Sequence, residues 1–87
     1  APRLFMGAAA VGSKGAMQAD PVLVAAERRL IERADEVILL VDSSKFLSRS
    51  GTIVCDLGEI DILITDSGID DNSRAMIEKA GPKLIIA

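Results

Sequence analysis

Short apolar runs that do not alternate with polar residues recur along the chain. They occupy residues 4–6, 37–41, 62–64 and 84–86. Runs of Val, Ile and Leu without alternation are typical of strands that are buried on both faces, as in a parallel sheet. The pattern predicts four parallel strands near residues 3–7, 37–42, 62–66 and 83–86.

Two segments carry helical signals. Asp20-Pro21 places an N-cap residue before a proline at the first helical position, which predicts a helix over residues 21–34. Its apolar positions leave Glu27, Arg28, Glu32 and Arg33 for solvent. A second helix is expected over residues 71–80, where Gly81-Pro82 ends it.

The remaining segments give weaker signals. Residues 8–20 are small and rich in glycine, so we expect a loop there. Residues 52–55 are expected to form a short edge strand, and residues 57–60 a helical turn. The order of strands and helices favours right-handed crossovers and an α/β fold, with a parallel sheet flanked by helices.

Composition excludes several function classes. A chain of 87 residues is one domain or part of one, and its net charge of −3 without a basic stretch argues against direct binding to nucleic acid. The absence of His and the single Cys55 argue against His-dependent catalysis and against a metal site. No apolar run is long enough for a membrane span, and a lone cysteine fits the cytoplasm. We expect no cofactor.

Polar residues follow three of the predicted strands. They are Gly7, then Asp42-Ser43-Ser44-Lys45, then Asp66-Ser67. Ligands of open α/β sheets bind at this carboxyl edge. Ser43, Ser44 and Lys45 could hold an anion, with Asp42 on a sugar hydroxyl; the alternative is a helix-capping turn with a solvated lysine.

Two further motifs have structural alternatives that we favour. The segment from Gly7 to Gly15 has the glycine spacing of a nucleotide phosphate loop, but Ser13 precedes Lys14, which reverses the required order. A flexible connection is the better interpretation. Asp66, with the two aspartates at 70 and 71, could suggest a cation site, but a turn followed by a helix cap explains them more simply.

The same residues carry a family resemblance. Leu4-Phe5-Met6-Gly7, the helix ending in residues 29–34, the run from Glu36 through Asp42-Ser43-Ser44-Lys45-Phe46, and the later Ile62-Leu63-Ile64-Thr65-Asp66 resemble the effector domain of DeoR-family transcriptional repressors. The resemblance covers essentially the whole chain.

The resemblance implies a fold like that of ribose-5-phosphate isomerase and the coenzyme A transferases. It implies that residues 1–87 are the C-terminal part of the sensor, and that operator DNA is contacted only by a winged helix outside these residues. The ligand would be a phosphorylated sugar or a related metabolite, and Lys45 would be the cleft lysine, with Asp42, Ser43, Ser44 and Gly7 beside it. We expect a homo-oligomer, because a domain this small gains little from its own core.

Two enzyme or signalling alternatives remain at this point. A sugar-phosphate isomerase of the same fold needs a general base, for which Asp42, Asp66 or Glu59 could serve. A receiver-like domain would use Asp42 as a phosphoacceptor, but it needs an acidic pair after the first strand, where Ala8-Ala9 stands. The sensor, which is not an enzyme, is the function we expect.

Overall fold

The four apolar runs form one parallel sheet, as predicted. In a computed structural model that describes residues 2–47 and 51–87, β1 (Arg3–Met6), β4 (Glu36–Leu40), β6 (Ile62–Thr65) and β7 (Lys83–Ile86) lie side by side in that order. All three neighbouring pairs are parallel, and the register places Leu39 beside Leu63 and Leu63 beside Leu84. The carboxyl ends of the strands therefore meet at one edge.

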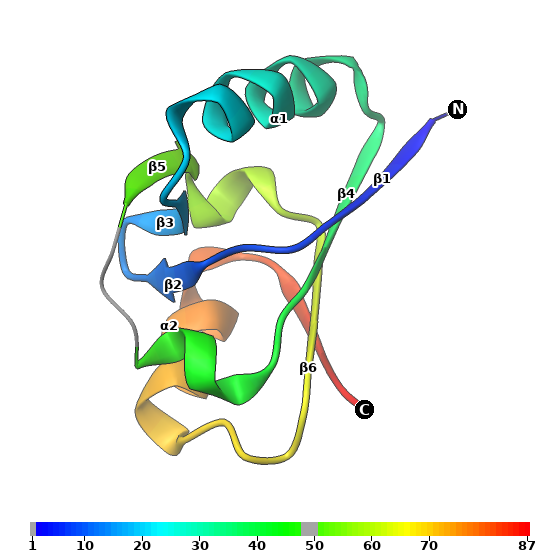
Figure 1. Ribbon diagram of the computed structural model, residues 1–87. Coiled ribbons are helices and arrows are strands. Elements are labelled where there is room, and N and C mark those ends of the chain that lie inside the picture. The colour runs from blue at the N-terminus through cyan, green and yellow to red at the C-terminus, as the bar shows by residue number, and fades with distance from the viewer. Residues whose placement is uncertain (1, 48–50) are drawn as a thin grey trace.

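The two faces of this sheet differ in burial. Leu39 and Leu63 lie on the inner face and are fully buried in the core. Phe5, Leu40 and Ile85 alternate with inner residues and remain exposed to solvent. The prediction of strands buried on both faces is therefore wrong at these three exposed positions, because both helices and a second sheet lie on the same side (Figure 1). It holds for the middle of β4, where Val37, Ile38 and Leu39 are all buried.

The second sheet is antiparallel and was partly missed by the sequence interpretation. Its order is β2 (Ala10–Gly12), β3 (Gly15–Gln18) and β5 (Thr52–Cys55), so the strand expected at residues 52–55 is confirmed. Residues 8–20 form a hairpin rather than the predicted loop. Small side chains explain the difference, since Ala10 and Ala16 are fully buried and let this sheet approach the core closely.

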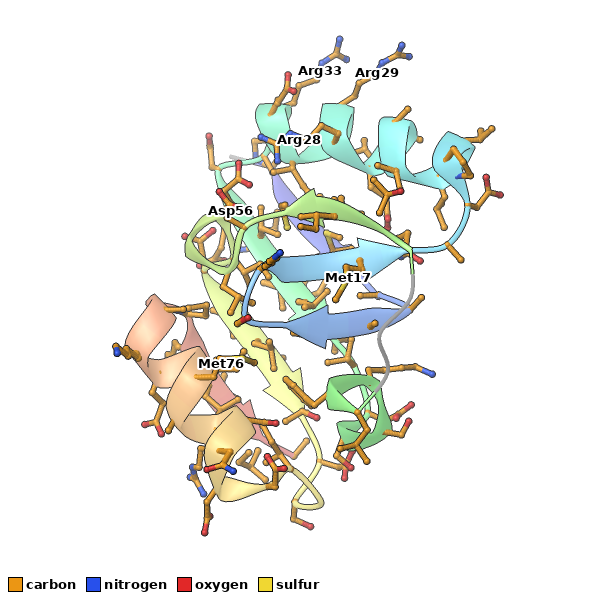
Figure 2. The ribbon with its side chains drawn as sticks, turned by 90° about the vertical axis from the view of Figure 1, so that its left-hand side faces the viewer. Met17, Arg28, Arg29, Arg33, Asp56 and Met76 are labelled. Carbon is orange, nitrogen blue, oxygen red and sulfur yellow. The ribbon has the colours of Figure 1, made fainter. Side chains whose placement is uncertain are left out.

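Helix α1 (Pro21–Arg33) begins as predicted, with the Asp20 side chain accepting a hydrogen bond from the Val22 amide at 2.9 Å. Arg28, however, does not extend into solvent. Its guanidinium donates to both carboxylate oxygens of Glu59, at 2.9 and 2.7 Å, and to the Val54 carbonyl at 3.1 Å. Arg29 and Arg33 do point away from the body (Figure 2). Arg28 thus ties α1 to β5 and to the turn after it.

Glu27 is a second correction on this helix. The sequence interpretation assigned it to solvent, but the residue is half-buried. Burial raises the pKa of its carboxyl group above the ordinary value. The inner side of α1 is therefore more polar than its apolar stripe predicts, and its one buried residue among those described is Ile31.

Short helices complete the chain. The 3-10 helices η1 (Ser43–Phe46) and η2 (Leu57–Glu59) follow β4 and β5, and the latter confirms the predicted helical turn. Helix α2 (Asp71–Ala80) buries Ile77 and ends at Gly81, as expected. Asp70 caps α2 through the Ser73 amide at 2.7 Å, so the capping interpretation of this aspartate is confirmed.

Gly15 provides a direct test of the hairpin. Its φ of +133° is a left-handed conformation, and a Cβ there would lie 2.0 Å from the Cys55 carbonyl oxygen. We expect Gly15→Ala to lower the free energy of unfolding by at least about 2 kcal/mol, because backbone strain and a backbone clash add. Urea unfolding followed by circular dichroism measures it.

Gly58→Ala is the matched control, since a Cβ at this position meets its nearest neighbour only at 3.9 Å. If both substitutions destabilise the protein equally, or if neither does, the close approach of β3 and β5 is not as described.

Candidate functional site

A polar turn follows β4 at the carboxyl edge of the parallel sheet. Asp42 is the N-cap residue of η1, and its carboxylate accepts hydrogen bonds from the Ser44 amide at 3.0 Å and from the Ser44 hydroxyl. These bonds from Ser44 lower the pKa of Asp42. The capping role proposed as one alternative for this turn is therefore present, and it engages the carboxylate of Asp42.

Asp66 joins this turn to the one that follows β6. One carboxylate oxygen accepts from the Ser43 amide at 2.6 Å, and the other accepts from the Gly68 amide at 2.9 Å. The amide of Ser43, followed by that of Gly68, lowers the pKa of Asp66. Gly68 lies close to the Ser43 side chain, and a Cβ at position 68 would be 2.6 Å from the Ser43 hydroxyl. Asp66 thus fixes the relative position of two turns.

A cavity of about 460 Å³ opens beside these turns. The β2–β3 hairpin forms one wall, η1 contributes Phe46, and the first turns of α2 form the opposite wall. Met17 and Met76, labelled in Figure 2, lie on these two walls. The lining residues are Val11, Gly12, Ser13, Lys14, Met17, Phe46, Asn72, Ser73 and Met76.

A smaller cavity of about 280 Å³ lies on the other side of Phe46. Ser43 and Ser44 line it, together with Gly68 and Asp70 from the following turn. Phe46 packs against the core. Phe46 and Ser73 both border the two cavities. Phe46 thus attaches the turn to the core.

The structure separates three of the predicted site residues, Asp42, Lys45 and Gly7, from these cavities. The Lys45 ammonium lies 3.9 Å from an Asp42 carboxylate oxygen, and its side chain is 38% exposed. The Gly7 carbonyl accepts a hydrogen bond from the Gln18 side chain at 3.0 Å. Asp42, Lys45 and Gly7 line neither cavity, whereas Ser43 and Ser44 line the smaller one.

Sequence reasoning missed the polar groups of the larger cavity. Ser13 and Lys14 form the tip of the hairpin, and Asn72 and Ser73 stand in the first turn of α2. The serine and lysine had been noted only as a reversed phosphate-loop motif. A hairpin predicted over these residues would have placed Ser13 and Lys14 opposite α2 and would have identified them as site residues.

The chemistry of the larger cavity suits a small anion that carries hydroxyl groups. Lys14 supplies positive charge, while hydroxyl and amide side chains supply hydrogen-bond donors and acceptors. Within residues 2–47 and 51–87, no group of three His, Cys, Asp or Glu side chains is placed to hold a metal ion.

Asp66 makes the link between the two turns testable. Because its folded pKa lies below the ordinary value of about 3.9, its contribution to stability is present above that value and is lost as pH falls through the folded pKa. We expect Asp66→Asn to lower the melting temperature at pH 7. The difference in melting temperature between wild type and this variant should narrow toward about pH 2. Differential scanning calorimetry across pH measures both.

Asp35→Asn is the control, since the Asp35 side chain makes no hydrogen bond or ion pair within the described part of the chain. If the difference in melting temperature between wild type and Asp66→Asn stays constant from pH 7 to acid, the charge of Asp66 contributes nothing to stability.

Comparison with known proteins places this arrangement in a family. The helices among residues 2–47 and 51–87 include none long and apolar enough to cross a membrane. Residues 1–67 match the model of the DeoR C terminal sensor domain. Since this match covers most of the chain, the family is established by it.

Three relatives give the same result. The chain is 42% identical over 52 residues to the uncharacterized HTH-type transcriptional regulator YulB of Bacillus subtilis, covering 60% of this chain and 20% of that protein. It is 41% identical over 56 residues to the HTH-type transcriptional regulator GlpR of Haloferax volcanii, covering 64% and 22%. It is 39% identical over 59 residues to a putative aga operon transcriptional repressor of Escherichia coli O157:H7, covering 68% and 22%.

These matches span about a fifth of each relative's length. The relatives are transcriptional regulators by their descriptions. The chain therefore belongs to the DeoR family of transcriptional regulators, as a C-terminal sensor domain.

Proposed function

We propose that this sensor binds a phosphorylated sugar or a related anionic metabolite at the carboxyl edge of the parallel sheet. The observation that supports it best is the cavity of about 460 Å³ in which Lys14, hydroxyl groups and Phe46 come together. Ligand pockets of proteins commonly fall in this size range and combine apolar walls with a few polar groups. A sugar phosphate has matching chemistry, with one anionic end and several hydroxyls.

Lys45 is proposed as a second charged contact, as the family resemblance implies. Its ion pair with Asp42 is long, at 3.9 Å, and partly exposed to solvent. Exposed pairs of this kind are worth less than about 1 kcal/mol, so an anionic ligand can compete for the ammonium. Ser43, Ser44, Asp42 and Gly7 are proposed to bind the ligand beside Lys45.

The wider role follows from the family. We propose that ligand binding controls operator binding through an N-terminal DNA-binding domain outside residues 1–87, with residues 1–87 as the C-terminal part of the sensor. The regulator would act in the cytoplasm as a homo-oligomer. Light scattering that shows a compact, thermally stable monomer at micromolar concentration would contradict the oligomer.

An isomerase of the same fold is less well supported. Its candidate bases, Asp42, Asp66 and Glu59, are each held by structural hydrogen bonds, and these bonds lower the pKa of all three. A general base at neutral pH is favoured by the opposite shift, toward pH 7. Turnover of ribose 5-phosphate or glucosamine 6-phosphate by the full-length regulator would overturn this argument.

Two lysine substitutions test the proposed site. Loss of a charged hydrogen-bond partner costs about 1.5–3 kcal/mol, so Lys45→Ala and Lys14→Ala should each weaken effector binding roughly ten- to a hundredfold. Calorimetric titration of the full-length regulator with a panel of phosphorylated pentoses and hexoses measures the affinity, and circular dichroism checks the fold. Operator binding should stay normal while the metabolite no longer releases it.

Lys83→Ala is the control, because Lys83 begins β7 at the opposite edge of the sheet. An effect of Lys14→Ala alone would remove Lys45 from the site and keep the cavity. Unchanged affinity in both variants would contradict the proposed cleft.

A further inference from the structure

The outward side of α1 carries a stripe of apolar side chains. Residues three or four positions apart lie on one side of a helix, and such a set runs along α1 from its first turn to its last. Val22 is 78% exposed, Leu30 is 52% exposed and Leu23 is 42% exposed. Ala26, which is also exposed, lies midway between them. We call these four residues the outer stripe of α1.

Contacts on the inward side of α1 explain why the outer stripe faces away from the body. Val24 packs against the core and Ile31 is buried in it, while Arg28 between them donates to Glu59. These three residues lie on the side of the helix opposite the outer stripe, and Figure 1 shows no described segment over that stripe. The apolar side of a surface helix normally faces the core, so an outward row of this kind marks an interaction surface.

Charged side chains of opposite sign lie at the two ends of α1. Arg29 and Arg33 point away from the body at the C-terminal end (Figure 2). Neither arginine forms an ion pair with another residue among 2–47 and 51–87. Asp20 lies at the N-terminal end, where one carboxylate oxygen caps the helix through the Val22 amide. The outward side of α1 therefore has an apolar centre between an acidic end and a basic end.

This order of charges makes the surface complementary to itself. We propose that the outer stripe of α1 binds the same stripe of a second copy of this chain, with the two helices antiparallel. Arg33 and Asp20 lie on either side of Ala26 at nearly equal distances, about 10 Å along the helix at a rise of 1.5 Å per residue. An antiparallel pair centred on Ala26 thus brings each basic end to the acidic end of the other helix. A parallel pair would place like charges together.

The sizes of the side chains fit this arrangement. Ala26 would lie at the two-fold axis, where its small side chain lets the helix axes approach to about 8 Å. Leu30 of each helix would then pack between Val22 and Leu23 of the other. Such an isologous contact uses one patch on both subunits, so it closes as a dimer. It deepens the proposed homo-oligomer, on which it rests, by naming the surface that forms it.

Partners of other chemistry match this surface less well. An acidic protein would pair with Arg29 and Arg33 but would be repelled by Asp20. Nucleic acid would engage the two arginines through its phosphates and leave the outer stripe uncovered. A second copy satisfies the apolar centre and both charged ends at once.

Cross-linking of the full-length regulator tests the position of the contact. Ala26→Cys places a thiol at the proposed two-fold axis, and Ala75→Cys is the matched control at an exposed alanine of α2. The native Cys55 is buried, and burial raises its pKa to about 11, so it contributes little background. A short bifunctional maleimide should join two chains of Ala26→Cys and should leave the chains of Ala75→Cys separate.

Leu30→Glu tests the energetics of the same contact. A charge in the apolar centre of the interface should raise the dissociation constant of the dimer roughly tenfold or more, as measured by analytical ultracentrifugation. Because Leu30 is exposed in the single chain, circular dichroism should show an unchanged fold. If this variant does not fold, the cross-linking experiment still decides the question.

The remaining outcomes contradict the proposal in distinguishable ways. A monomeric wild type would overturn both this contact and the proposed homo-oligomer. An oligomeric wild type without a cross-link in Ala26→Cys would overturn this contact alone. In that case, slow thiol labelling of Ala26→Cys at every protein concentration would show that another part of the same chain covers the stripe, and fast labelling would show that it is open. A cross-link together with an unchanged dissociation constant in a folded Leu30→Glu would show an incidental contact and would also overturn the proposal.

Discussion

Parallel pairing of β1, β4, β6 and β7 is the constraint on which the rest of the structure depends. It brings the carboxyl ends of the strands to one edge, so the turns that follow β4 and β6 become neighbours although they are distant in sequence. Asp66 then joins them by accepting hydrogen bonds from Ser43 and Gly68. The position of the candidate site is therefore a consequence of backbone pairing, and its detailed shape depends on one carboxylate.

The second sheet decides what the site can bind. Its hairpin folds over the inner face and carries Lys14 to the mouth of the cavity, opposite the first turn of α2. Arg28 stabilises this arrangement, because its bidentate pair with Glu59 joins α1 to the segment after β5. The bidentate geometry strengthens this pair relative to a singly bonded surface pair, although the two side chains are 39% and 34% exposed.

Local sequence signals were sufficient for the parallel strands and the helices. The runs of Val, Ile and Leu located the parallel sheet, and Asp20 and Asp70 cap helices as their positions suggested. The hairpin could not be predicted in this way, since Ala and Gly give no periodic pattern and β3 is stabilised by pairing with β5, more than thirty residues away. Lys14 was missed for the same reason, and so was the partner of Arg28, because both depend on contacts between distant segments.

Hydrogen exchange gives the most direct test that the carboxyl edge is the ligand site. Full-length regulator would be compared with and without a phosphorylated sugar that releases it from the operator. We expect slower exchange in the segments 11–14, 43–47 and 67–73, which line the two cavities, and no change at residues 58–61 on the opposite edge. Protection confined to other parts of the regulator, or unchanged exchange in all three segments, would contradict the account.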